Sequence, residues 1–271
     1  MIKSTNYMFN KDIALEENRI CAFIDILGFS SEITSTDVVR REKIITLLKR
    51  ISEEDTQMGV EEENLGLGVV KYYSAEVTSF SDNIVISIPI DSDNFNLYWD
   101  SFLNKIIGVY WDALQLGLLF RGGITIGRLY HKNNVVIGEA LVNSANIEKK
   151  ASFPFIEVDS KSIEFIKSLP IYKNSSDFDR DFLFKNEKYI VNTLGYHLLV
   201  WMNYLYYNEI EKISSKEIIK IVESIISVSK LNIEKFKRES NQKVLEKWEW
   251  FLSNFLEEYD KGHWLILRQS K

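Results

Sequence analysis

The spacing of apolar residues changes several times along the first 160 residues of this 271-residue chain. Dense apolar runs are typical of buried strands, whereas apolar residues three or four positions apart indicate a helix. In chain order the spacing predicts a strand at 19–29, a helix at 36–51, a hairpin of strands at 69–80 and 83–90, a helix at 95–116 and a strand at 118–127. This is the order of the ferredoxin-like unit, an α+β fold in which helices cover one face of an antiparallel sheet.

The rest of the chain adds to this unit. The pattern predicts a strand at 135–137, a helix at 139–150, a strand at 155–158, a helix at 161–169, a loop at 173–180, an edge strand at 189–192 and two long helices, one from 214 and one ending near Gly262. The aromatic stripe of the last helix is more typical of core packing than of a ligand site. We expect one domain over residues 1–160 and a mostly helical extension over residues 161–271, packed on it and without chemistry of its own.

One carboxylate interrupts the first predicted strand. Asp25 lies in an apolar run and is followed by Gly28, with Ser30 and Ser31 as candidate N-caps of a helix. A buried carboxylate is costly unless it is paired, hydrogen-bonded or bound to a metal. A strand, a carboxylate, a glycine turn and a helix N-terminus together suit a metal-bound triphosphate. The alternative is that Asp25 only caps a turn, which is the commoner role of such a residue.

A second carboxylate favours the metal-binding interpretation of Asp25 over the turn-capping one. Asp82 lies in the turn of the predicted hairpin, and in the ferredoxin-like topology this hairpin is next to the first strand. Asp25 and Asp82 are therefore expected to be neighbours. Two carboxylates so close repel one another and their pKa values split, unless a cation lies between them. The sequence thus predicts a site for hard divalent cations such as Mn²⁺ or Mg²⁺.

Composition narrows the class of protein. The chain is 45% hydrophobic and carries a net charge of −6, so we expect a globular protein without a nucleic-acid partner. The single cysteine, Cys21, excludes intramolecular disulfides, and the chain shows neither a signal peptide nor an apolar run of membrane-spanning length. We therefore expect a cytoplasmic protein with no membrane partner, and we interpret His131 and the other two histidines as structural or solvent-facing.

Four segments, taken in order, resemble the motifs of the class III nucleotidyl cyclases. They are Phe23-Ile-Asp-Ile-Leu-Gly-Phe-Ser30, Phe80-Ser-Asp-Asn83, Arg121-Gly-Gly-Ile-Thr-Ile-Gly127 and the stretch from Gly138-Glu-Ala-Leu-Val-Asn143 to Glu148. The resemblance covers residues 19–160 and implies that residues 1–160 form a cyclase catalytic domain. It also implies two metal ions per active site, which two carboxylates hold and which act on a nucleoside triphosphate.

The resemblance assigns a role to each matching position. Asp25, Asp82 and the Ile26 carbonyl are implied to bind the two metal ions, and the backbone N–H groups of Leu27, Gly28 and Phe29 the β- and γ-phosphates. Arg121 is implied to bind the triphosphate and to neutralise the leaving pyrophosphate. Asn143 and Asn146 are candidates for orienting ribose or phosphate, and a helix-surface or capping role is equally compatible with them. The family's transition-state Arg is absent, because Ile147 occupies that position; Lys149, Lys150 or the partner subunit are the candidates to replace it.

The base-reading positions differ from those of purine cyclases. Thr78 stands where that group has a Lys, and Val135 where it has an Asp. The stretch from Gly138-Glu-Ala140 to Asn146-Ile-Glu148, followed by Phe153-Pro-Phe-Ile-Glu-Val-Asp159, is similar to the pyrimidine cyclases of bacterial Pycsar anti-phage systems. This implies a homodimer with shared active sites, a cyclic CMP or cyclic UMP product and a downstream effector protein that binds it. Thr78 is expected to contact the base, with Tyr72 and Tyr73 narrowing the pocket.

Three alternatives remain beside the pyrimidine cyclase, and the choice between CTP and UTP stays open. One is a purine cyclase with an unfamiliar base pocket. Another is a degenerate cyclase-like module that binds a nucleotide without turnover, against which the presence of both carboxylates argues. The last is a palm-type polymerase relative, against which the lack of a Gly-Gly-Asp-Asp or Gly-Gly-Asp-Glu hairpin argues.

Overall fold

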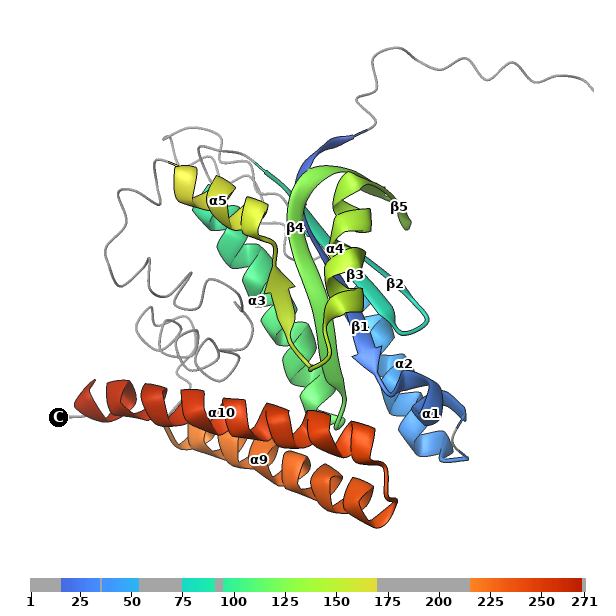
Figure 1. Ribbon diagram of the computed structural model, residues 1–271, viewed down its shortest axis with the longest axis vertical. Helices are drawn as coiled ribbons and strands as arrows, with labels where there is room; N and C mark the ends of the chain where they lie inside the picture. The colour runs from blue at the N-terminus through green and yellow to red at the C-terminus, as the bar shows by residue number, and fades with distance from the viewer. Residues whose placement is uncertain (1–15, 35, 54–74, 91–94, 170–214, 270–271) are drawn as a thin grey trace, which may run out of the picture.

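The computed structural model describes residues 16–34, 36–53, 75–90, 95–169 and 215–269 (Figure 1). The elements are β1 (Glu17–Leu27), α1 (Phe29–Thr34), α2 (Val38–Glu53), β2 (Glu76–Phe80), β3 (Asn83–Pro89), α3 (Phe95–Gln115), β4 (Leu119–Lys132), β5 (Val135–Gly138), α4 (Glu139–Lys150), β6 (Ile156–Val158), α5 (Ser160–Ser168), α9 (Ser215–Arg238) and α10 (Gln242–Gln269). The predicted loop at 173–180, the edge strand at 189–192, residues 69–74 of the hairpin, Tyr72 and Tyr73 lie outside the described residues.

The sheet has the predicted ferredoxin-like core. Its strand order is β2-β3-β1-β4-β5, with β1 in the middle and antiparallel to both β3 and β4. The short strand β6 pairs in parallel with the beginning of β4. This arrangement confirms the α+β class, and it brings the end of β1 beside the β2–β3 turn on one side and beside β4 on the other.

The two faces of β1 have different partners. Ile20, Ala22, Ile24 and Ile26 point into a core that includes buried residues of α2 and α3. Cys21 points to the opposite face, where its cluster includes Ala140 of α4 and Leu129 of β4. The expectation that helices cover one face only is therefore wrong: α4 covers part of the second face.

Glycines on β4 explain why a helix fits there. A Cβ atom on Gly123 would lie 2.3 Å from the carbonyl oxygen of Ser144 and 2.5 Å from Cβ of Ile147. Gly127, four residues along β4, lies beneath Ala140, and a methyl group on Gly127 would lie 3.5 Å from the Ala140 Cβ. The helix approaches the sheet so closely at Gly123 that no side chain fits between them.

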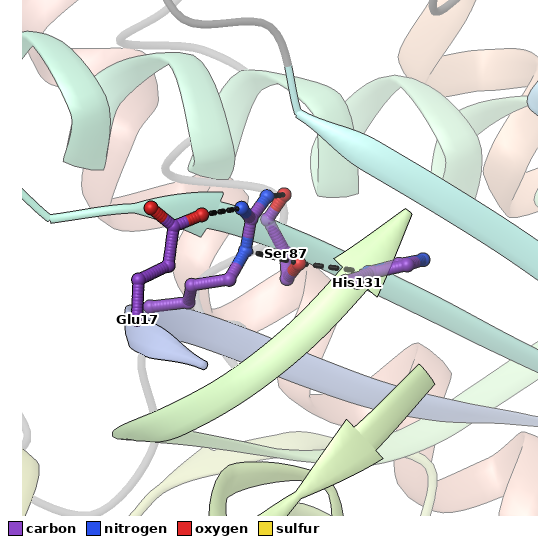
Figure 2. Close-up of polar contacts among 4 residues, drawn as sticks. Glu17, Ser87 and His131 are labelled. Carbon is purple, nitrogen blue, oxygen red and sulfur yellow. Dashed lines mark hydrogen bonds and ion pairs between the residues drawn. The ribbon is translucent and has the colours of Figure 1, made fainter. Parts of the chain in front are cut away.

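A row of buried polar side chains continues across this second face (Figure 2). Arg19 Nε donates to Ser87 Oγ at 2.9 Å, and Glu17 forms an ion pair with Arg19. Ser87 Oγ lies 2.8 Å from His131 Nδ1, and His131 Nε2 lies 2.9 Å from Thr78 Oγ1. Burial, and then the charge of Arg19, lowers the pKa of His131 to about 4, so the ring is neutral at physiological pH. His131 therefore fits its interpretation as structural.

Several strands and helices begin or end at other residues than predicted. The first strand spans Glu17–Leu27 rather than 19–29, and a separate helix, α1, begins at Phe29, so Ser30 and Ser31 lie inside it rather than at its N-cap. The strand predicted at 118–127 extends to Lys132, because it forms a hairpin with β5 around Asn133 and Asn134. Both asparagines have positive φ, 51° and 63°, as a tight hairpin turn requires.

The last two helices belong to the same hydrophobic core. Val222 and Ile225 of α9, with Trp248, Phe251 and Phe255 of α10, are buried in the cluster that contains the inner face of β1. Helix α10 continues through Gly262 to Gln269, so the predicted end near Gly262 is wrong. Among the residues that the structure describes, no helix is long and apolar enough to cross a membrane. The domain boundary at residue 160 stays a prediction.

Candidate active site

The register of the central strands brings the two predicted metal carboxylates together. Asp25 pairs with Asn83 across the β1–β3 ladder, and the Ile26 N–H donates to the Asp82 carbonyl at 2.8 Å. The Asp25 side chain is 16% exposed. Burial, the largest effect, raises the pKa of Asp25, and the charge of Asp82 raises it further, whereas Arg121 lowers it. The two carboxylates therefore interact electrostatically, as the sequence predicts.

Arg121 faces this pair from the other side of β1. It is the cross-strand partner of Asp25, and its Nε–H donates to Asp25 Oδ2 at 3.1 Å. The same Nε lies 2.5 Å from Glu148 Oε1; this contact is an ion pair, because the single Nε hydrogen points to Asp25. Nη1 donates to the Ala151 carbonyl at 3.3 Å. Arg121 thus lies between two carboxylates, one from β1 and one from α4.

Glu148 is the first residue of this site that the sequence analysis missed. It is 5% exposed, and burial raises its pKa while Arg121 lowers it. A signal was present in the sequence: Ala140, Ser144 and Glu148 are four residues apart, so they share one face of α4, and all three are buried. A carboxylate that continues a stripe of small buried residues needs a cationic partner.

The two asparagines do not join the cluster within one chain. Asn146 is exposed, and its position two residues before Glu148 places it about 200° around the helix from that carboxylate. Asn143 is partly exposed, also away from the buried stripe. Lys149 and Lys150 are exposed at the end of α4, and Ile147 packs over Gly123. Their roles in catalysis stay predictions.

The predicted phosphate loop follows directly after Asp25. Gly28 joins β1 to α1 with φ at 81°, a conformation that favours glycine, and its carbonyl accepts from the Glu32 N–H at 3.3 Å. Phe29 begins α1, and Leu27 ends β1. The site residues from 25 to 29 therefore surround one tight turn at the end of the central strand.

The predicted base-reading residues lie further along the sheet. Thr78 on β2 pairs with Val85, which pairs with Phe23, so Thr78 lies two strands from β1 and on the same face as Asp25. It is buried, and its hydroxyl is hydrogen-bonded to His131. Val135 is 54% exposed at the start of β5.

Lys247 on α10 is the second residue that the sequence analysis missed. It is partly buried, and burial lowers its pKa, as does the nearby charge of Arg121, while Asp25 raises it. These effects place the ammonium group within electrostatic reach of the Asp25–Arg121 pair. The last helices therefore bring an ionisable group near the site, and the expectation that they carry no chemistry stays a prediction.

The donor set suits a hard cation. Asp25 and Asp82 offer oxygen atoms only, and their repulsion is of the kind that a divalent ion relieves. Within the described part of the chain, no group of three or more His, Cys, Asp or Glu side chains is arranged to hold a metal ion. Two carboxylates alone are compatible with Mg²⁺ or Mn²⁺, because these ions keep several ligands from water or substrate phosphates.

Comparisons with known proteins give similarity in structure only. No family model and no curated protein matches the sequence. The catalytic core of a rhodopsin-guanylyl cyclase with converted specificity, solved in complex with ATPαS, is 14% identical with a TM-score of 0.37, over 56% of this chain and 83% of that chain. An adenylate/guanylate cyclase/hydrolase from Silicibacter pomeroyi is 16% identical with a TM-score of 0.33, over 59% of this chain and 83% of that chain.

Proposed function

We propose that this protein is a nucleotidyl cyclase that converts a pyrimidine nucleoside triphosphate into its 3′,5′-cyclic monophosphate and pyrophosphate. One observation carries the proposal: the strand register places Asp25 beside Asp82 and opposite Arg121. Asp82 raises the pKa of Asp25, and two carboxylates this close suit divalent cations, whereas an adjacent guanidinium suits phosphate. The four cyclase-like motifs of the sequence include all three residues.

Each residue has a proposed task in this reaction. Asp25, Asp82 and the Ile26 carbonyl would hold two Mn²⁺ or Mg²⁺ ions, which would supply positive charge beside the phosphates and the ribose 3′-hydroxyl. The turn at Gly28 lets the backbone approach the β- and γ-phosphates. Arg121 neutralises the charge that develops on the leaving pyrophosphate.

The reaction is balanced within a single nucleotide. The ribose 3′-oxygen loses its proton to solvent and forms a bond to the α-phosphorus. The bond between the α-phosphorus and the oxygen that bridges it to the β-phosphorus breaks. Pyrophosphate leaves with the electron pair of the broken bond. The part of the protein is chiefly to position the 3′-oxygen and to stabilise negative charge.

The finer parts of the proposal concern base and assembly. We propose that Thr78 contacts a single-ring base, since a short hydroxyl and Val135 replace the pair that would read a purine. We also propose a homodimer in which Asn143 and Asn146 serve the partner's site, because both lie on the side of α4 away from Glu148. The product would act as a second messenger in anti-phage defence, through an effector protein.

A second candidate is favoured by one contact. Arg121 is already paired with Asp25 and Glu148, as in a module that binds a nucleotide without turnover. One experiment separates the two: incubation of the full chain with Mn²⁺ and each of the four nucleoside triphosphates, with cyclic product and pyrophosphate both measured. A cyclase releases both in equal amounts, and Asp25→Asn and Asp82→Asn each release neither. Nucleotide binding without product in the unmodified protein favours the second candidate.

A further inference from the structure

Helix α10 runs past the end of the sheet at which β4 begins (Figure 1). Two aromatic contacts fix its position there. Trp250 stacks on Phe153 with centroids 5.2 Å apart, and Phe153 lies in the loop after α4. Phe251 meets Tyr110 of α3 edge-on at 6.4 Å, and Tyr110 in turn stacks on Phe120 of β4 at 5.0 Å.

These contacts direct Lys247 toward the active site. Lys247 precedes Trp250 by three residues and Phe251 by four, so the three side chains share one face of α10. The Trp250 contact leads to the Arg121 side of β4, because Arg121 Nη1 donates to the Ala151 carbonyl at the start of the loop that carries Phe153. The Phe251 contact holds α10 against the opposite face of β4 through Tyr110 and Phe120. The Lys247 side chain therefore approaches the cluster from the α10 side.

The two cations of the site differ in their partners. Arg121 divides its charge between Asp25 and Glu148, whereas Lys247 forms no ion pair with any residue in the described ranges of the chain. Burial, and then the charge of Arg121, disfavours the charged form of Lys247 and lowers its pKa, although Asp25 favours that form, so a further anion beside the ammonium group would be favourable. A triphosphate has several negative charges, and an ammonium group binds phosphate as a point charge.

We propose that Lys247 binds the phosphate chain of the substrate, so that α10 forms one wall of the active site. The proposal rests on the proposed function, because that function supplies the triphosphate. It identifies a phosphate-binding residue outside the cyclase-like motifs and gives the C-terminal helices a direct role in the reaction. Activity then requires residues 242–269 as well as the sheet.

The test compares two charge-removing substitutions on the same helix. Lys247→Met removes the ammonium group but keeps an unbranched side chain that can pack, and Lys243→Met removes an exposed charge one turn earlier as a matched control. Isothermal titration of the full chain with inorganic tripolyphosphate and Mn²⁺ measures phosphate binding without a base. We expect Lys247→Met to raise the Kd at least tenfold, Lys243→Met to raise it less than twofold, and Lys247→Arg to restore most of the affinity.

The outcomes separate this proposal from the proposed function. If the unmodified protein forms no cyclic nucleotide from any of the four triphosphates, the proposed function fails and this inference fails with it. If the unmodified protein binds tripolyphosphate and Lys247→Met binds it equally well, Lys247 is not a phosphate ligand and only this inference is overturned. Should Lys247→Met fold poorly, as circular dichroism would show, Lys247→Gln replaces it in the same titration. In turnover assays the loss should appear in kcat/KM for the nucleotide, with the melting temperature unchanged.

Discussion

Gly123 is the residue at which a single methyl group most directly tests how α4 is positioned on the sheet. A Cβ atom there would lie 2.3 Å from the Ser144 carbonyl oxygen, whereas an ordinary carbon–oxygen contact is about 3.3 Å or longer. Because the opposing atom is backbone, relief of the clash requires α4 to move by about 1 Å. Glu148 is on the same helix as Ser144, so this movement also displaces the carboxylate from Arg121.

The expected loss of stability follows from this geometry. Forcing an extra methyl group into a packed interface costs about 1–3 kcal/mol. Gly127 offers a matched control, because the contact its Cβ would make with Ala140 is an ordinary 3.5 Å. At that position, alanine should stabilise the strand by about 0.5–1 kcal/mol relative to glycine. The same gain applies at Gly123, so it cancels in the comparison, and we expect Gly123→Ala to be about 1–3 kcal/mol less stable than Gly127→Ala, which is the cost of the clash.

Urea unfolding monitored by circular dichroism measures this difference directly. Each variant is unfolded at 25 °C, and the free energies of unfolding are compared provided that their slopes against urea concentration are equal. Gly123→Ala should also lose cyclase activity beyond its loss of stability, since Arg121 loses its partner on α4. Equal stability of the two variants would contradict the reasoning, because it would mean that α4 does not pack against β4 at Gly123.

Three further results are expected. In metal-free protein at pH 7, the melting temperature of Asp25→Asn should be no lower than that of the unmodified chain. The reason is that burial and Asp82 raise the pKa of Asp25, so its negative charge is destabilising. Added Mn²⁺ should raise the melting temperature of the unmodified protein only. The pKa of His131 is about 4 in the folded protein against an ordinary value of 6.5, so the free energy of unfolding falls as the pH decreases from 6.5 to 4. The loss at pH 5 should be about 2 kcal/mol. A pH series of unfolding measurements on His131→Gln should lack this loss. Inactive Asp25→Ala chains mixed with inactive Asn143→Ala chains should regain activity if the site is shared between subunits; no recovery after confirmed subunit exchange would refute the shared site.

Much of the core architecture could be predicted because its signals are local. The apolar spacing of the first 160 residues predicts the strand and helix order, and that order alone makes Asp25 and Asp82 neighbours. Arg121 is assigned to the same site by the resemblance of its segment to a cyclase motif, and in the structure β4 is the other neighbour of β1. The neighbourhood of the two carboxylates needs only the strand order, whereas the role of Arg121 needs the resemblance.

The missing parts of the site depend on packing that no local pattern reports. Glu148 reaches Arg121 because Gly123 lets α4 approach the second face of the sheet, which the sequence analysis left uncovered. Lys247 approaches the cluster because Trp250 and Phe251 dock α10 onto residues that are far away in the chain. The aromatic stripe of α10 indicated that the helix is buried, but not where.

The most direct test of the cyclase proposal is a competition among substrates. The full chain is incubated with Mn²⁺ and equal concentrations of ATP, GTP, CTP and UTP, and the products are identified by mass spectrometry, with Asp82→Asn as the inactive control. We predict cyclic CMP or cyclic UMP as the main product, with one pyrophosphate released per cyclic nucleotide. A main product of cyclic AMP or cyclic GMP would contradict the pyrimidine assignment, and linear products or none would contradict the cyclase itself.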